Sequence, residues 1–400
     1  MHIVAINPPQ PELFDADAYP ALGLLYLLGV LERAGHTTVY VRADEASGPL
    51  PGADAYLVTA TTALVPAARA LLARLRIEHP AAHLVVGGVD PTIEPKPWLE
   101  VADCVVTGEA EKAIAGIVEH RATGIVRAGT LIDVDEDRAL DWAPIPPRRH
   151  IRPDLTGVVS SGRRGVASTT VCTSRGCPYS CTFCTRIEMT KRVRYHSVGR
   201  IVEEFGLLWD QGFRFLRVVD DMFALWERRV VEIGDALGRD RRPFRWLAIT
   251  RADKLTVRMA EAMAGGGCEE VHFGVETGSE RLMRVVKKAE RPDDVARGTA
   301  IARAAGLKVK WFLIADLPTE TREDIEATKA LVLRCRPDKT TVSVFTPIPG
   351  SELFQRCIND LPGEGFFYRE REPELKRWVR EEYIPTLDHD EVTANMRGVA

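Results

Sequence analysis

The sequence predicts an α/β protein with two parallel-sheet domains in series: a doubly wound, Rossmann-like sheet, then a partial (β/α)6 barrel. Three observations predict this. Short β-rich runs alternate with helical runs over residues 1–140, a stretch without periodicity occupies residues 141–166, and a second alternating series fills residues 167–350. Such alternation is typical of parallel sheets covered by helices.

The front domain, residues 1–140, has five short apolar runs that we expect as strands, with helical segments between most of them. The strand runs are HIVAI, TTVYV, AYLVTAT, HLVVGG and ADCVVTG. About a dozen residues, RADEASGPLPGAD, separate the second run from the third, which is too short for a connecting helix with two loops. Ligands of doubly wound sheets bind beyond the carboxyl ends of the strands.

Residues 141–166 are rich in Pro, Gly and Arg and are predicted to be a linker. The six strand-helix units of residues 167–350 are too few for a closed eight-stranded barrel, so we expect an open one. Its reactive groups would lie at the carboxyl ends of its strands. Residues 351–400 are expected to form a small helical cap.

Composition excludes little but sets the compartment. The 400 residues carry a net charge of -4 without a long basic run, so nucleic acid is not an expected partner. No stretch approaches the roughly 18 continuous apolar residues of a membrane span, and a cytoplasmic location is expected. Cytoplasmic thiols stay reduced, so the eight cysteines indicate metal or redox chemistry.

Three cysteines, Cys177, Cys181 and Cys184, lie on one loop just past the first strand of the second series. Their spacing suits three corners of a [4Fe-4S] cluster whose fourth iron has no protein ligand, and such an open position marks a catalytic site. One alternative is a closed site, zinc or cluster, with Cys172 as fourth ligand. Another is that the cysteines are inert and buried, as predicted for Cys104, Cys268, Cys335 and Cys357.

The segment TSRGCPYSCTFC resembles the signature of the radical S-adenosylmethionine (SAM) superfamily, and VVDDMF, HFGVETGS, FLIADLPTET and TPIPGSELF follow in that family's order. The resemblance spans roughly residues 168–356. It implies that the open iron binds SAM. An electron from a donor such as flavodoxin or ferredoxin would then cleave SAM to methionine and a 5'-deoxyadenosyl radical, which abstracts a substrate hydrogen.

The resemblance also implies a SAM-binding set, named with the alternative role of each residue. Phe183 would lie along the adenine, or pack the loop. Asp220 or Asp221 would bind the SAM amino group, or cap the following loop, and strand alternation lets only one face the barrel mouth. Arg251 would bind the carboxylate, or form a surface ion pair. Glu276 would bind the ribose, or cap the next helix.

One turn departs from the family pattern. Relatives usually have glycines in an LPGET turn after the fifth strand, where this chain has Asp316 and Thr319. Glycine lets the backbone approach a ligand, so these side chains would narrow the pocket or give it polar contacts. Asp316 is therefore a candidate substrate contact.

The front domain resembles the cobalamin-binding module that precedes many such barrels, through YPALGLLYLLGVLERAGHTTVYV and HLVVGGVDPTIEPKPWLEVADCVVTGEAE. The resemblance implies cobalamin over the strand ends at Thr59, Thr61, Thr62, Gly87 and Gly88. The cobalt-ligating histidine motif of cobalamin mutases is absent. The alternatives are a domain that only supports the barrel and, for the glycine pair, a simple strand-ending turn.

Together these features predict a radical SAM enzyme acting on a small molecule such as a secondary metabolite, by cobalamin-dependent methylation. The alternative is cobalamin-independent dehydration, epimerisation or rearrangement, for example of a sugar or aminoglycoside. Epimerisation needs a cysteine that returns a hydrogen atom, for which Cys268, Cys335 and Cys357 are candidates. A non-enzymatic alternative is a structural metal-binding module with four cysteines.

Overall fold

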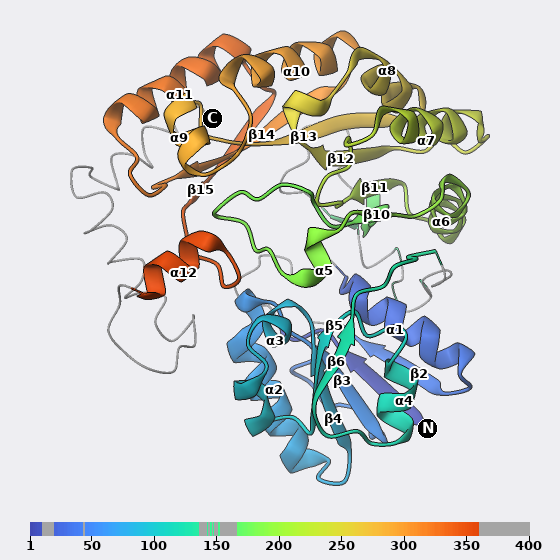
Figure 1. Cartoon of the computed structure of the whole chain (residues 1–400). Coiled ribbons are helices and arrows are strands. Elements are labelled where there is room, and N and C mark those ends of the chain that lie inside the picture. The colour runs from blue at the N-terminus through green and yellow to red at the C-terminus, as the bar shows by residue number, and fades with distance from the viewer. Residues whose placement is uncertain are drawn as a thin grey trace. The chain divides into compact units, whose positions relative to one another are not determined.

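The computed structural model describes residues 1–9, 20–42, 45–135, 142, 145, 147, 151–152 and 166–359. Most of the expected linker, 141–166, and the expected cap beyond residue 359 lie outside the described residues. The chain divides into two compact units (Figure 1). The first is Met1–His150 with Ile187–Tyr195, and the second is Ile151–Arg186 with His196–Ala400. None of the described helices combines the length and apolar character needed to cross a membrane.

The first unit is built on a six-stranded parallel sheet of order β2-β1-β3-β4-β5-β6. Its strands are β1 (His2–Ile6), β2 (Thr37–Val41), β3 (Ala55–Thr59), β4 (His83–Gly87), β5 (Cys104–Gly108) and β6 (Gly124–Gly129). Its helices are α1 (Leu22–Arg33), α2 (Val65–Glu78), α3 (Val89–Ile93) and α4 (Ile114–Glu119), with 3-10 turns at Thr62–Leu64 and Lys96–Glu100. The strand order reverses between β1 and β3. A ligand is therefore expected beyond the carboxyl ends of the strands near this point.

Two details of this sheet bear on the sequence expectations. As expected, the described residues between β2 and β3 contain no helix. The sequence did not predict β6, an edge strand whose residues alternate between half-buried and exposed. Strands of this kind lack the continuous apolar run that identified the central ones.

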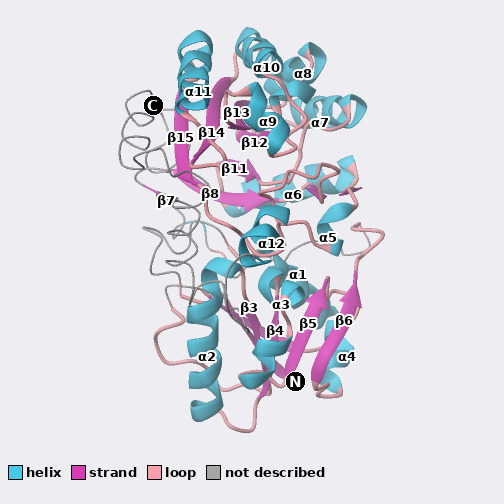
Figure 2. Cartoon of the chain, turned by 60° about the vertical axis from the view of Figure 1, so that its left-hand side comes forward, coloured by secondary structure: helices cyan, strands magenta, loops and turns pink. Residues whose placement is uncertain are grey.

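The second unit contains a seven-stranded sheet of order β15-β14-β13-β12-β11-β8-β7, parallel except for β7 against β8. The strands are β7 (Ile151–Arg152), β8 (Val166–Val171), β11 (Phe215–Val218), β12 (Trp246–Thr250), β13 (Cys268–Glu276), β14 (Lys308–Ala315) and β15 (Lys339–Val344). The order has two free ends, so the expected open barrel is confirmed (Figure 2). A short strand, β9 (Ser174–Arg175), follows β8.

The helices that connect these strands are α6 (Val198–Gln211), α7 (Glu227–Arg239), α8 (Val257–Gly265), α9 (Glu280–Val285), α10 (Pro292–Ala304), α11 (Arg322–Cys335) and α12 (Glu352–Asn359), with a 3-10 turn at Ala252–Lys254. Four of them begin where a hydroxyl accepts a backbone N–H, a strong start signal. The caps are Ser197, Thr256, Ser279 and Thr321. The segment Ile187–Tyr195, with α5 (Glu188–Lys191) and β10 (Arg194–Tyr195), belongs to the first unit.

The two faces of the barrel sheet differ sharply. Trp246, Phe273 and Trp311 are fully buried on one face. On this face the ring centres of Trp246 and of Phe205 in α6 lie 6.2 Å apart. Since strand residues alternate, the strand register places Glu270, His272 and Lys310 on the other face. These ionisable side chains are also buried.

Lys310 is the least expected member of this second group. Its ammonium lies 4.6 Å from the Phe312 ring centre, while His272 Nε2 lies 3.2 Å from Glu270 Oε2. Burial, aided by the charge of Lys339, lowers the pKa of Lys310 to about 8. A cation held here therefore costs stability at neutral pH.

We expect Lys310→Met to stabilise the chain at pH 7 and to flatten its alkaline stability profile. Because the folded-state pKa of Lys310 is below its ordinary value of 10.5, the unfolded chain binds more protons between pH 8 and 10.5. Stability gains from this group across that window, by up to about 3 kcal/mol. Urea unfolding at pH 7, 8.5 and 10 measures it, and an identical pH-dependent rise in the variant would contradict it.

Candidate active site

The cysteine loop is irregular, and main-chain hydrogen bonds hold it at its start, middle and end. Gly176 N donates to Asp221 Oδ2 at 2.9 Å, just before the first cysteine. Between the second and third cysteines, Thr182 N donates to Val286 O and Thr182 O accepts from Leu353 N, both at 2.9 Å. After the third, Arg186 N donates to Gly350 O at 3.1 Å. The loop is therefore fixed without regular secondary structure.

Asp220 anchors the chain that leads into this loop. Its carboxylate accepts three hydrogen bonds of 2.6 Å, from Thr173 N, Thr173 Oγ1 and Ser174 Oγ, and only 2% of the residue is exposed. Asp221, the next residue, is exposed. The two side chains therefore have different surroundings. Asp220 is buried and holds the residues before the loop, whereas Asp221 is exposed.

The three thiols lie near one another, since each of Cys177 and Cys181 contributes to raising the pKa of Cys184. Loss of hydration raises the pKa of all three thiols, that of Cys184 to about 12, although Cys184 remains exposed and the other two are half-buried. Within the described ranges, no three His, Cys, Asp or Glu side chains gather as ligands of a single ion. A cluster spreads its ligands over several irons, so three cysteines on one loop suit a cluster better than a single ion.

Cys172 has a different environment. Its thiol donates to Ser174 O at 2.9 Å, and burial together with the charge of Asp220 raises its pKa well above the usual value. This hydrogen bond directs the Cys172 thiol at the backbone of β9. The geometry gives the four-cysteine alternative no support.

Arg251, expected at the SAM carboxylate, is already engaged. It is 5% exposed, and its Nε donates to Asp253 at 2.8 Å while its two terminal nitrogens donate to the carbonyls of Lys288 and Ala289. Its guanidinium carbon lies 4.0 Å from the ring centre of Tyr179, on the cysteine loop. It is neither a surface ion pair nor an open cation, and it connects the end of β12 to the turn after α9.

The same turn carries Lys288, which the sequence reasoning missed. Lys288 is 4% exposed, and its ammonium lies 3.4 Å from Glu276 Oε1 and 3.9 Å from Glu290 Oε2. Its charge lowers the pKa of Cys181 against the effect of burial, which places it beside the cysteine loop. The only signal in the sequence was a pair of lysines after an apolar helical run, and lysines in that position are usually exposed to solvent.

Glu276 and Phe183, the remaining predicted SAM contacts, differ in their surroundings. Glu276 ends β13 after a register shift at Gly274 and has a φ of 68°, an uncommon conformation for a residue other than glycine. The structure thus joins Glu276 to Lys288 near Cys181. Phe183 is half-buried between the second and third cysteines.

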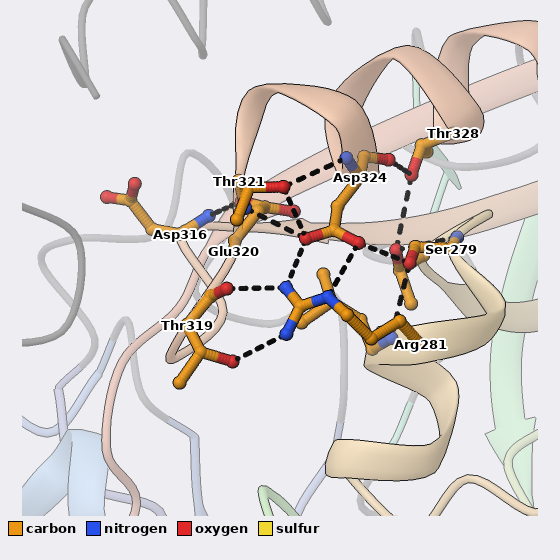
Figure 3. A network of polar contacts seen from close by, with 10 residues as sticks. Ser279, Arg281, Asp316, Thr319, Glu320, Thr321, Asp324 and Thr328 are labelled. Atoms are coloured by element: carbon orange, nitrogen blue, oxygen red, sulfur yellow. Dashed lines mark hydrogen bonds and ion pairs between the residues drawn. The ribbon is translucent and has the colours of Figure 1, made fainter. Parts of the chain in front are cut away.

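The turn after β14 has the backbone of a glycine turn without its glycines. Asp316 and Thr319 have φ values of 68° and 70°. Asp316 N donates to Glu320 Oε2 at 2.6 Å, and Arg281 connects the carbonyl of Thr319 to Asp324 (Figure 3). The Asp316 carboxylate points away from this network. Burial, with hydrogen bonds opposing it, raises the pKa of Glu320 to about 8, so this carboxyl is largely protonated at neutral pH.

In the first unit, the ends of β3 and β4 interlock. Ala60 N donates to Gly87 O at 2.9 Å, and a Cβ on Gly88, whose φ is 109°, would lie 2.6 Å from Ala60 O. Close packing alone therefore requires glycine at 88. Thr59 and Thr62 are half-buried and Thr61 is exposed. The buried Thr62 hydroxyl has no partner among the described residues, as a polar ligand at this edge would require.

Comparison with known families identifies both units. Residues 171–332 match the radical SAM superfamily, and residues 16–118 match the B12 binding domain. The chain therefore carries a radical SAM domain behind a B12-binding domain, as the sequence motifs predicted.

Several known proteins are similar to this chain over most of its length. An uncharacterized methyltransferase of Pyrococcus horikoshii is 29% identical over 75% of this chain and 68% of its own length. The anaerobic magnesium-protoporphyrin IX monomethyl ester cyclase of Cereibacter sphaeroides is 24% identical over 85% of this chain, which spans 60% of that enzyme. The methyltransferase TsrM of Kitasatospora setae, solved with cobalamin and a [4Fe-4S] cluster, covers 91% of this chain and is covered over 79% of its own, at 17% identity and a TM-score of 0.69.

Replacing the anchor of the cysteine loop should reduce cluster assembly. In Asp220→Asn the amide would face donors from Thr173 and Ser174, and each unsatisfied buried group costs about 1–3 kcal/mol. We expect less iron per chain after anaerobic reconstitution and faster alkylation of the loop cysteines. Asp210→Asn, at an exposed pair with Arg242, is the control. Full iron content with unchanged alkylation in Asp220→Asn would refute the anchoring role.

Proposed function

Because the chain carries a radical SAM domain behind a B12-binding domain, we propose that it is a cobalamin-dependent radical SAM methyltransferase acting on a small molecule. The observation that carries the proposal is the anchored three-thiol loop beside the buried Lys288. When bound, the cluster would supply one electron and an open iron for SAM, and cobalamin would carry the methyl group. Cys177, Cys181 and Cys184 would hold the cluster.

The other residues would bind SAM around that loop. Lys288 takes the role first expected of Arg251, because its ammonium, beside Glu276 and Glu290, can also donate to the SAM carboxylate. Glu276 would accept the ribose hydroxyls and Phe183 would lie along the adenine. Asp221 is the better candidate for the SAM amino group, since Asp220 is bound to Thr173 and Ser174.

At the other site, the edge formed by Thr59, Thr61, Thr62, Gly87 and Gly88 would hold cobalamin. The buried Thr62 hydroxyl, which has no partner among the described residues, supports this assignment. TsrM, which shares the fold, has been solved with cobalamin and also with its tryptophan substrate. A small-molecule substrate near Asp316 and reduction by a flavodoxin or ferredoxin complete the proposal.

A radical rearrangement without cobalamin has less support. Epimerisation needs an accessible cysteine, yet Cys268 is 5% exposed with its thiol directed at Glu270 O, and Cys335 is 7% exposed. The Cys357 side chain lies outside the described residues. Dehydration needs no such cysteine but leaves the B12-binding domain without a role.

Anaerobic reconstitution with iron, sulfide and hydroxocobalamin, then incubation with SAM and a chemical reductant, tests the function. We expect a bound corrinoid, 5'-deoxyadenosine and, with a suitable acceptor, S-adenosylhomocysteine with a methylated product. Bound cobalamin without any cleavage of SAM would refute the radical mechanism. SAM cleavage by protein that never retains cobalamin would refute methyl transfer through cobalt.

Adjacent lysines provide a matched test of SAM binding. Lys288→Ala should raise the dissociation constant for SAM about tenfold or more, because a charged hydrogen bond is worth about 1.5–3 kcal/mol. Lys287→Ala is the control, since Lys287 is half-exposed and pairs with Glu352. Equilibrium binding to cluster-loaded protein measures both. Equal SAM affinity in the two variants at equal iron content would remove Lys288 from the site.

A further inference from the structure

The segment Ile187–Tyr195 begins three residues after Cys184, yet it packs in the first unit. Arg194 within it forms a buried ion pair with Glu109, their side chains being 3% and 8% exposed. Arg194 also donates to Leu131 O at 2.8 Å and to Met189 O at 2.6 Å, and Glu109 accepts from Leu131 N at 2.6 Å. The chain leaving the cysteine loop is thus held at a sheet edge of the other domain.

Glu109 is connected by short contacts to the edge proposed for cobalamin. The carbonyl of Ala60, after β3, accepts from Asp90 N in α3 at 3.1 Å. Thr92 Oγ1, in the same helix, donates to Gly88 O at 2.7 Å and accepts from Gly108 N at 3.0 Å. Gly108 precedes Glu109 in the chain. An unbroken series of contacts therefore runs from the ends of β3 and β4, through Thr92, to the Glu109–Arg194 pair.

We propose that this series couples the two sites: a corrinoid at the β3 and β4 ends orders Thr92 and Glu109, and Arg194 passes that order to residues 187–195 and so to the cysteine loop. Glu109, Thr92 and Arg194 are positioning residues in this scheme and contact no reacting atom. The inference rests on the proposed function, because it takes the corrinoid as the ligand of this edge.

A buried ion pair is a suitable part for this role. Its net contribution to stability is small, whereas removal of one partner leaves an unpaired buried charge and costs about 3–5 kcal/mol. Separating Glu109 from Arg194 is therefore unfavourable, so that a change in the position of one side chain is followed by the other. A ligand that orders Glu109 would in this way also order residues 187–195.

Backbone hydrogen exchange of residues 187–195 tests the coupling without relying on turnover. In the cluster-loaded full chain, hydroxocobalamin should slow exchange in this segment on the order of fivefold or more. Thr92→Val keeps the side-chain shape but removes the acceptor for Gly108 N. It should still bind the corrinoid, seen by its absorbance, and lose the protection. Glu109→Gln should do the same, and Asp103→Asn, at the opposite end of β5 in a pair with Arg76, should behave as wild type.

The outcomes separate the two proposals. Protection that persists in Thr92→Val and Glu109→Gln, or bound corrinoid without protection in the wild type, would overturn the coupling and leave the methyltransferase proposal intact. Protection without methylation of any acceptor would sustain the coupling and count against methyl transfer. Absence of corrinoid binding would overturn both. If Glu109→Gln fails to fold, Thr92→Val carries the test, since it leaves the ion pair intact.

Discussion

The buried carboxylate of Asp220 is the interaction on which the site depends. Three thiols can share a cluster only if an irregular loop holds them together, and a loop has no hydrogen-bond ladder of its own. Asp220 supplies a substitute by collecting Thr173 N, Thr173 Oγ1 and Ser174 Oγ at the end of the strand that precedes the loop. Hydrogen bonds to a charged acceptor contribute about 1.5–3 kcal/mol each, which is enough to fix one conformation.

What the sequence could predict was local or periodic. Strand and helix alternation predicted the fold class, and the spacing of Cys177, Cys181 and Cys184 within one loop led to the prediction of a cluster site. Alternation also predicted that Asp220 and Asp221 would differ in orientation, although not that Asp220 would be the buried anchor. The edge strand β6 was missed because half of its residues face solvent.

Residues whose roles depend on contacts distant in sequence could not be assigned in this way. Arg251 looked like an open cation at a strand end, and only the fold brings the carbonyls of Lys288 and Ala289 to its nitrogens. From the sequence, Lys288 would be expected in solvent. In the structure its neighbours, residues 287 and 289, both have positive φ, and the Lys288 side chain lies beside Glu276. Two residues of the same charge thus differ in availability for reasons that no spacing encodes.

Electrostatics explain why both cations belong beside the cysteine loop. Burial alone would keep the thiols protonated, and metal binding must release those protons. Lys288 and Arg251 both lower the pKa of Cys181, and so oppose the rise that burial causes. Buried cations are costly unless paired, and Glu276, Glu290 and Asp253 provide the pairing. The ion pairs of Lys288 and Arg251 therefore favour a thiolate at Cys181, which is the charge state that a cluster bound by this loop would require.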